Sequence, residues 1–301
     1  MGRSYGMSEF HERRLPAGLA PALGVLAVGT LFLASPVRTA ALGLLDTFRV
    51  QRFAAVTIDP SKLPWVHQAP TAGAPAAKDG KHGDPNAFGT YTGPLKLNKP
   101  QTVASVAAAE AKLSTRLADA GSAIAGQSLA TVQVGEAVDA SYTFDTAKLQ
   151  AAIDQSGMKG VQAPEQLNGK TFTAHLPAAV FVRYGQGEDG ALFAQAPSPS
   201  LDIPDGVNMD YLRQDVLAIP GLPADLVAQL QAIQDWQHTL VLPLPPNGKS
   251  QDVKVAGNPG LLVSDAAGSY NAVLWQRQGS LYLLGGKLPA AQVQAAAAAV
   301  R

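Results

Sequence analysis

The stretch that decides the fold of this chain is Asn271–Leu284, which reads Asn-Ala-Val-Leu-Trp-Gln-Arg-Gln-Gly-Ser-Leu-Tyr-Leu-Leu. It predicts two strands, 271–277 and 280–284, joined by a tight turn at Gln278-Gly279. Further strands are predicted upstream, each bounded by Gly, Pro, Asn or Ser clusters, at 238–244, 251–256 and 260–264. Short strands with short connections indicate an antiparallel β-meander.

Helical patterns flank these strands. Five helices are predicted, and they lie at about 104–117, after Asp145, from Met209, from Pro223-Ala224-Asp225 and from Pro289 to Arg301. The strands expected between them are 171–176, 178–184 and 191–196. Segregated strands and helices of this kind are typical of α+β folds. Residues 101–301 are therefore predicted to form an α+β domain, an antiparallel meander with packed helices.

An uncharged run of twenty residues, Leu15–Ala34, lies between Arg13-Arg14 and Ser35-Pro36. At about 1.5 Å per residue, a helix of this length just covers a hydrocarbon core of about 30 Å. A secretory signal is the alternative, but it needs small residues before the cleavage point. Cleavage after Ala34 or Ala40 would place Phe32 or Arg38 three residues before the cut. We therefore expect an uncleaved transmembrane helix and contact with the membrane through Leu15–Ala34.

The charges around the span predict its orientation. Arg13 and Arg14 adjoin the span, whereas Arg38, Arg49 and Arg52 follow it at a greater distance. The positive-inside rule then favours a short cytoplasmic tail, residues 1–14. The localisation expected is a single-pass protein of the cell membrane, with the C-terminal domain extracytoplasmic.

Residues 35–58 are expected to form a juxtamembrane amphipathic helix and a strand. The apolar residues of this helix recur at helical spacing and are Val37, Ala40, Ala41, Leu44, Leu45 and Phe48. This stripe predicts either packing on the body of the protein or a helix lying on the bilayer surface. Residues 59–100 show no periodicity and are rich in Pro, Gly and Ala, which predicts a flexible linker or loop.

Composition excludes several functions. Lys and Arg balance Asp and Glu, 23 against 23, so no basic footprint for nucleic acid exists. The chain has no cysteine, which removes disulfides, thiol nucleophiles and thiolate metal sites. No nucleophile elbow, phosphate loop or dinucleotide fingerprint occurs. We therefore expect no enzyme, no catalytic residue and no cofactor.

Two groups of residues are weighed as metal ligands. The histidines lack ligand spacing, and they are His11, His67, His82, His175 and His238. Oxygen-bearing side chains crowd one loop, and they are Asp202, Asp205, Asn208 and Asp210. Calcium favours clustered oxygen ligands, but the spacing departs from the EF-hand loop. A turn followed by a helix N-cap explains this loop better, and we expect no metal site.

Three aromatic residues are the candidate ligand or partner groove. Trp236 lies between a predicted helix and a predicted strand, so burial at that junction is expected. Trp275 and Tyr282 lie on consecutive strands and are expected side by side on one face. They form either part of the core or a groove for a lipid tail or a peptide, and the core is favoured.

Two stretches carry a resemblance to a known family. Residues 35–53, from Ser-Pro-Val-Arg to Leu-Asp-Thr-Phe-Arg-Val-Gln-Arg-Phe, are similar to the juxtamembrane part of bacterial proteins often encoded beside extracytoplasmic-function sigma factors. Residues 255–262 and 272–286 resemble the extracytoplasmic sensor domain of membrane-anchored anti-sigma factors, with a strand–turn–strand containing tryptophan, a glycine and a closing helix. No catalytic residue carries over from this resemblance.

One departure limits what the resemblance implies. Membrane-bound anti-sigma factors hold the sigma factor with a cytoplasmic domain, whereas only Met1–Arg14 is expected in the cytoplasm here. The resemblance therefore implies the sensing or binding half without the sigma-binding half. The expected function is a membrane-tethered, non-catalytic extracytoplasmic domain that binds an envelope protein or lipid partner. The alternative is a lipid or lipoprotein carrier with an apolar groove on a curved sheet.

Overall fold

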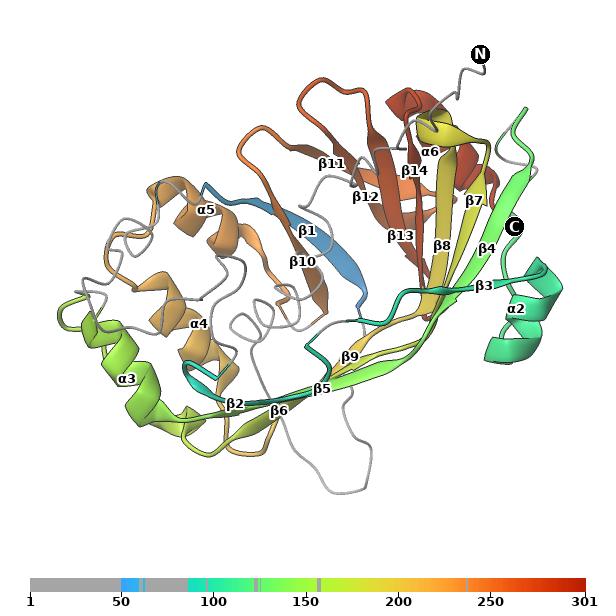
Figure 1. Ribbon diagram of the computed structural model, residues 1–301. Coiled ribbons are helices and arrows are strands. Elements are labelled where there is room, and N and C mark those ends of the chain that lie inside the picture. Colours follow the sequence, from blue (N-terminus) through green and yellow to red (C-terminus); the bar gives the residue numbers. More distant parts are fainter. Residues whose placement is uncertain are drawn as a thin grey trace, which may run out of the picture.

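The computed structural model describes residues 50–59, 62, 86–95, 97–121, 124, 126–155, 158–236 and 238–301. These residues form an α+β fold with five α-helices and three β-sheets (Figure 1). The predicted fold class is confirmed at this level. The predicted span 15–34 and the predicted helix within 35–58 lie outside the described residues.

The largest sheet has eight strands, and all neighbours in it are antiparallel. Its order is β11 (Lys249–Val255), β12 (Asn258–Ser264), β13 (Asn271–Arg277), β14 (Ser280–Gly286), β8 (Ala191–Pro197), β7 (Ala179–Tyr184), β4 (Leu129–Gly135) and β3 (Gln101–Val103). The last four strands of the chain form the predicted meander. Gly285 permits close strand approach, because a Cβ there would lie 2.6 Å from the Ala272 Cβ.

One predicted strand does not belong to this meander. β10 (Thr239–Leu244) pairs in parallel with β1 (Arg52–Thr57), and together they make a separate two-stranded sheet. The strand expected at 238–244 is confirmed, but its place in an antiparallel meander is wrong. Its run of apolar residues, Leu240–Leu244, predicts a strand without specifying the partner, which here is the first strand of the described chain.

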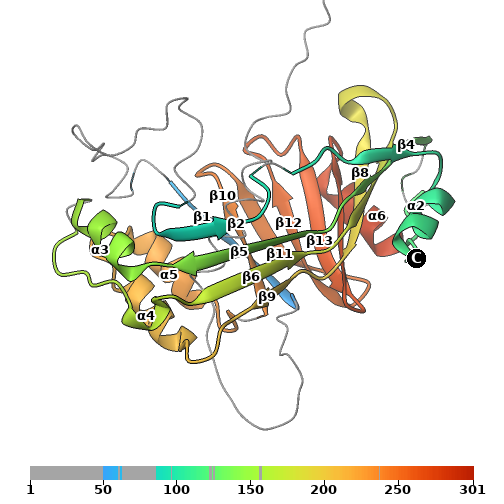
Figure 2. The same cartoon turned by 60° about the horizontal axis from the view of Figure 1, so that its bottom comes forward.

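The remaining sheet is an extension of the first. The eight-stranded sheet continues into a four-stranded sheet at three places, where one strand of each sheet follows the other along the chain after only two residues. These pairs are β4 with β5 (Val138–Phe144), β7 with β6 (Thr171–Leu176), and β8 with β9 (Ser200–Asp202). The four-stranded order is β2-β5-β6-β9. Figures 1 and 2 show this bent ribbon running from one sheet to the other. β2 (Gly89–Thr92) pairs with β5, so this part of 59–100 is a strand.

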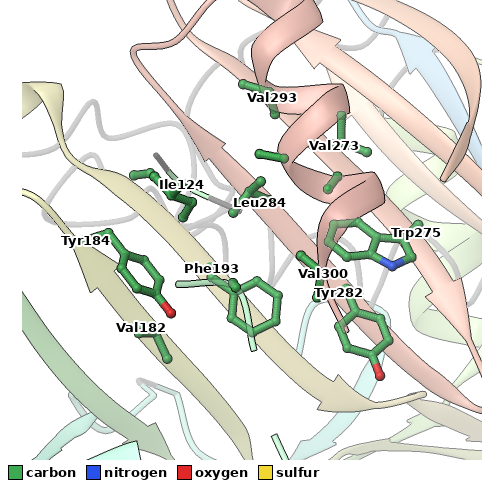
Figure 3. Packing of buried hydrophobic residues seen from close by; sticks show 14 of the residues in the cluster. Ile124, Val182, Tyr184, Phe193, Val273, Trp275, Tyr282, Leu284, Val293 and Val300 are labelled. Atoms are coloured by element: carbon green, nitrogen blue, oxygen red, sulfur yellow. The ribbon is translucent and has the colours of Figure 1, made fainter. Parts of the chain in front are cut away.

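Each sheet has its own helices and core. α6 (Ala290–Ala299) packs on β13 and β14, and Figure 3 shows it over Val273 and Leu284. α3 (Thr146–Gln155) and α4 (Met209–Leu217) share a core with the four-stranded sheet. α5 (Ala224–Ala232) packs on β1, and α2 (Val106–Leu113) on β3 and β4. The predicted helices are confirmed, although α2 is shorter than the expected 104–117.

None of the helices in the described part of the chain is long and apolar enough to cross a membrane.

Candidate functional site

A cleft of about 460 Å³ lies between the β1–β10 sheet and the outer face of β11 and β12. One wall consists of residues 52–55 of β1, Thr239 of β10, Gln229 of α5 and residues 232–235 at and after the end of α5. The opposite wall is Ser250–Asp252 with Leu261. Figure 1 shows β1 and β10 in front of these strands, with α5 at one end. The cleft therefore lies where two separate sheets meet.

Strand register decides which side chains line the cleft. Ser250 and Asp252 pair with Val263 and Leu261, so their side chains share the face of Leu261. That face points to β1, because β1 packs on β12 and both line the cleft. Gln251 pairs with Leu262, which belongs to the core beneath α6. The wall thus presents an apolar residue, a hydroxyl and a carboxylate.

Several polar side chains at the cleft have no hydrogen-bonding or ionic partner among the described residues. Within the described ranges, the side chains of Arg52, Ser250 and Asp252 make no hydrogen bond and no ion pair. Asp235 is different, because its carboxylate lies 3.0 Å from Nδ1 of His238 and also accepts the His238 N–H. The cleft therefore combines a cation and an anion that are both available to a ligand.

The backbone of β1 also opens onto the cleft. The N–H groups of Arg52 and Ile58 donate to carbonyls of the β10 segment, at 2.9 and 2.8 Å. In a parallel ladder alternate residues face opposite edges, so Phe53, Ala55 and Thr57 face away from β10. Gln229 Oε1 accepts the Thr57 N–H at 2.8 Å. Among the residues that the structure describes, no strand lies beside Phe53 and Ala55 on that edge, and both residues line the cleft.

The three predicted aromatic residues lie in two different cores. Trp275 and Tyr282 stack with ring centroids 5.2 Å apart and an interplanar angle of 12°. Both are buried beneath α6 and appear side by side in Figure 3. Trp236 is buried with α5 and β1, and the Arg213 guanidinium lies 4.9 Å from its ring centroid. The structure thus brings Trp275 and Tyr282 together, in the core, and separates them from Trp236.

The acidic loop is a turn and a helix cap. Asn208 is the N-cap of α4, and its side chain accepts the Tyr211 N–H at 3.2 Å. Asp202 binds His175 instead, and the Asp205 carbonyl accepts from Lys170 Nζ at 2.7 Å. No group of three metal-ligating side chains forms among the residues that the structure describes.

The Asn208 cap yields a testable consequence. We expect Asn208→Ala to lower the free energy of unfolding by about 1 kcal/mol, because an orphan N–H of α4 loses its acceptor. The loss should be the same with and without added calcium chloride in urea unfolding followed by circular dichroism. Asn208→Asp, which keeps the capping oxygen, is the control. A loss that calcium enlarges would contradict the capping role.

One polar cluster was missed at the sequence level. His175 bridges two carboxylates on the outward face of the four-stranded sheet, with Nδ1 2.8 Å from Asp139 and Nε2 2.9 Å from Asp202. The hydrogen bond to Asp202, and next that to Asp139, raise the pKa of His175 above its usual 6.5. His175 and Asp139 both lie at polar positions of strands in which apolar and polar residues alternate, and this alternation predicts that both side chains face outward. It does not predict that they contact each other, because they lie on different strands, 36 residues apart.

This cluster makes stability depend on pH. Because the folded pKa of His175 is raised, its contribution is complete below the unfolded value near 6.5 and is lost as pH rises through the folded pKa. His175 is 39% exposed, so we expect about 1 kcal/mol or less. His175→Gln should flatten the pH dependence of the urea midpoint above the unfolded pKa of about 6.5. An unchanged slope in that variant would rule out the assignment.

Comparison with family models, with curated proteins and with solved structures finds no match for this chain.

Proposed function

We propose that this chain is a membrane-tethered extracytoplasmic binding domain without catalytic activity, anchored by Leu15–Ala34 with residues 1–14 in the cytoplasm. The observation that supports it best is the cleft between β1 and β11–β12. Its volume of about 460 Å³ lies within the range of roughly 300–1,000 Å³ common for ligand sites. The side chains of Arg52, Ser250 and Asp252, which pair with no other described residue, give a ligand polar partners there.

The resemblance to the outer domains of anti-sigma factors supports a sensing role in the cell envelope. In this proposal the anchor keeps the domain at the membrane, and the signal is the occupancy of the cleft. The partner is then an envelope protein or ligand that meets the domain outside the cytoplasmic membrane.

Photo-cross-linking in living cells tests the binding function. A photoreactive benzoylphenylalanine replaces Gln234, which lines the cleft, in the full-length protein. We expect a discrete adduct after irradiation. The matched control carries the same group at Ala266, in the exposed β12–β13 turn. Equal adducts from both positions, or none from Gln234, would overturn a binding role for the cleft.

The absence of cysteine allows a clean test of topology. In spheroplasts we expect a membrane-impermeant maleimide to label Ala266→Cys at once. The same reagent should label Ser8→Cys, in the predicted cytoplasmic tail, only after the membrane is permeabilised. The reverse pattern would place the domain on the cytoplasmic side.

A lipid or lipoprotein carrier is the second candidate, and one observation favours it. Paired residues on the outer face of the eight-stranded sheet form an apolar, half-buried row across β7, β8, β14 and β13, and they are Phe181, Ala194, Leu283 and Leu274. Native mass spectrometry tests this function. Lipid that co-purifies with the protein, and is lost in Leu283→Glu, would support the carrier function over the binding domain.

A further inference from the structure

We propose that the cleft binds an extended peptide segment of a partner protein, which adds a strand to the free edge of β1. This inference rests on the proposed binding function and names the class of ligand. It follows from the backbone of β1: Phe53 and Ala55 line the cleft, and their N–H and C=O groups point away from β10 to an edge where the described part of the chain places no other strand.

Free strand edges are the usual sites of strand addition, because their unpaired backbone groups match those of an incoming chain. At one end of this edge, a side chain of the protein itself satisfies the outward backbone N–H. Gln229 Oε1 accepts the outward N–H of Thr57 at 2.8 Å, and its Nε2 donates to the Asp225 carbonyl at 3.1 Å. A side-chain amide thus occupies the place of a strand at Thr57. The edge stays open at Phe53 and Ala55, where the cleft lies.

The geometry sets the length and backbone of the ligand. A strand advances about 3.3 Å per residue, so the edge from Phe53 to Ala55 pairs with about three residues. Over this length, the backbone of Phe53 and Ala55 presents two N–H donors and two carbonyl acceptors to the ligand. The ligand must present its own N–H groups in return, which excludes proline at the paired positions.

The walls set the side chains of the ligand. Successive residues of an added strand point to opposite sides of the β1–β10 sheet. On one side lie Leu261 and Asp252, and on the other lies Ile233 at the end of α5. Because Asp252 is exposed and unpaired, a basic side chain next to an apolar one fits the β12 side. An apolar side chain fits over Ile233.

The test uses a randomised seven-residue peptide library panned against the full-length protein in lipid nanodiscs. Peptides without proline in the central positions should be enriched. Each enriched peptide is then resynthesised with single N-methyl groups. Methylation at alternate residues, whose N–H groups face β1, should weaken binding at least tenfold, whereas methylation at the intervening residues should change it less than twofold. Equal effects at every position would overturn strand addition.

Two further measurements identify the edge. Ser250→Cys carrying a bulky maleimide should block binding, whereas Ala266→Cys carrying the same group should not. Hydrogen exchange should show the amides of Phe53 and Ala55 exchanging fast in the free protein and protected with peptide. Protection of both amides without peptide would mean that the chain itself occupies the edge, and would overturn the proposal. If the photo-adduct at Gln234 survives blocking at Ser250, the binding function stands and strand addition fails.

Discussion

The Ala297→Asp variant should lose about 4 kcal/mol or more of the free energy of unfolding. Ala297 lies in α6 at 1% exposure, among the residues packed on the eight-stranded sheet. A carboxylate there is removed from water without a partner, and burial of an unpaired charge is among the few single changes with effects this large. Urea unfolding of the full-length protein, followed by far-ultraviolet circular dichroism, measures it.

The next residue in the same helix supplies the control. Ala298 is exposed, so Ala298→Asp keeps its carboxylate in water. It should cost about 1 kcal/mol, from lower helix propensity and from a negative charge near the helix C-terminus. Both terms are shared with Ala297→Asp, so the difference between the variants reports burial alone. Equal losses in the two variants would mean that α6 does not pack as described.

Trp275→Ala should lower the free energy of unfolding by about 3–5 kcal/mol, as large-to-small changes of buried aromatic residues do. Trp275 is 1% exposed and loses its stacking on Tyr282, whose ring centroid lies 5.2 Å away. The same unfolding measurement applies. It also separates the two interpretations of this pair, because an aromatic residue that lines an open groove loses far less on truncation than one in the core.

Tyr211→Ala is the matched control for Trp275→Ala. The Tyr211 side chain is 61% exposed on α4, and its removal should change the free energy of unfolding by about 0.5 kcal/mol or less. A loss below about 1 kcal/mol for Trp275→Ala would instead favour the groove interpretation.

Local signals predicted the elements of this fold well. Asp145 was expected to begin a helix, and its carboxylate accepts the Lys148 N–H at 3.1 Å at the start of α3. Phe172 and Ala174, expected on the inward face of a strand, are buried in β6. The hairpin of β13 and β14 turns at Gln278-Gly279, with Trp275 opposite Tyr282. Each of these depends on residues close in sequence, where spacing alone defines the face.

Other elements were missed although the sequence carried a signal for them. β4 and β5 were not predicted, yet apolar and polar residues alternate through Val138–Phe144 and through residues 131–134. They are held by pairing with β7 and with β6, which come later in the chain. β2, within the expected linker, is likewise held by its pairing with β5. The alternation thus marks β4 and β5 as strands, whereas only the tertiary structure decides their partners.

The sequence by itself determined the α+β class, most strands and helices, and the placement of Trp275 and Tyr282 side by side on one face. Only the tertiary structure decided that β10 pairs with β1, that His175 lies between Asp139 and Asp202, and that a cleft opens between β1 and β11–β12. The physical reason is the sequence separation over which each kind of interaction acts. Periodicity and caps act over a few residues, whereas strand partners, ion pairs and clefts join segments far apart along the chain, whose approach no local pattern encodes.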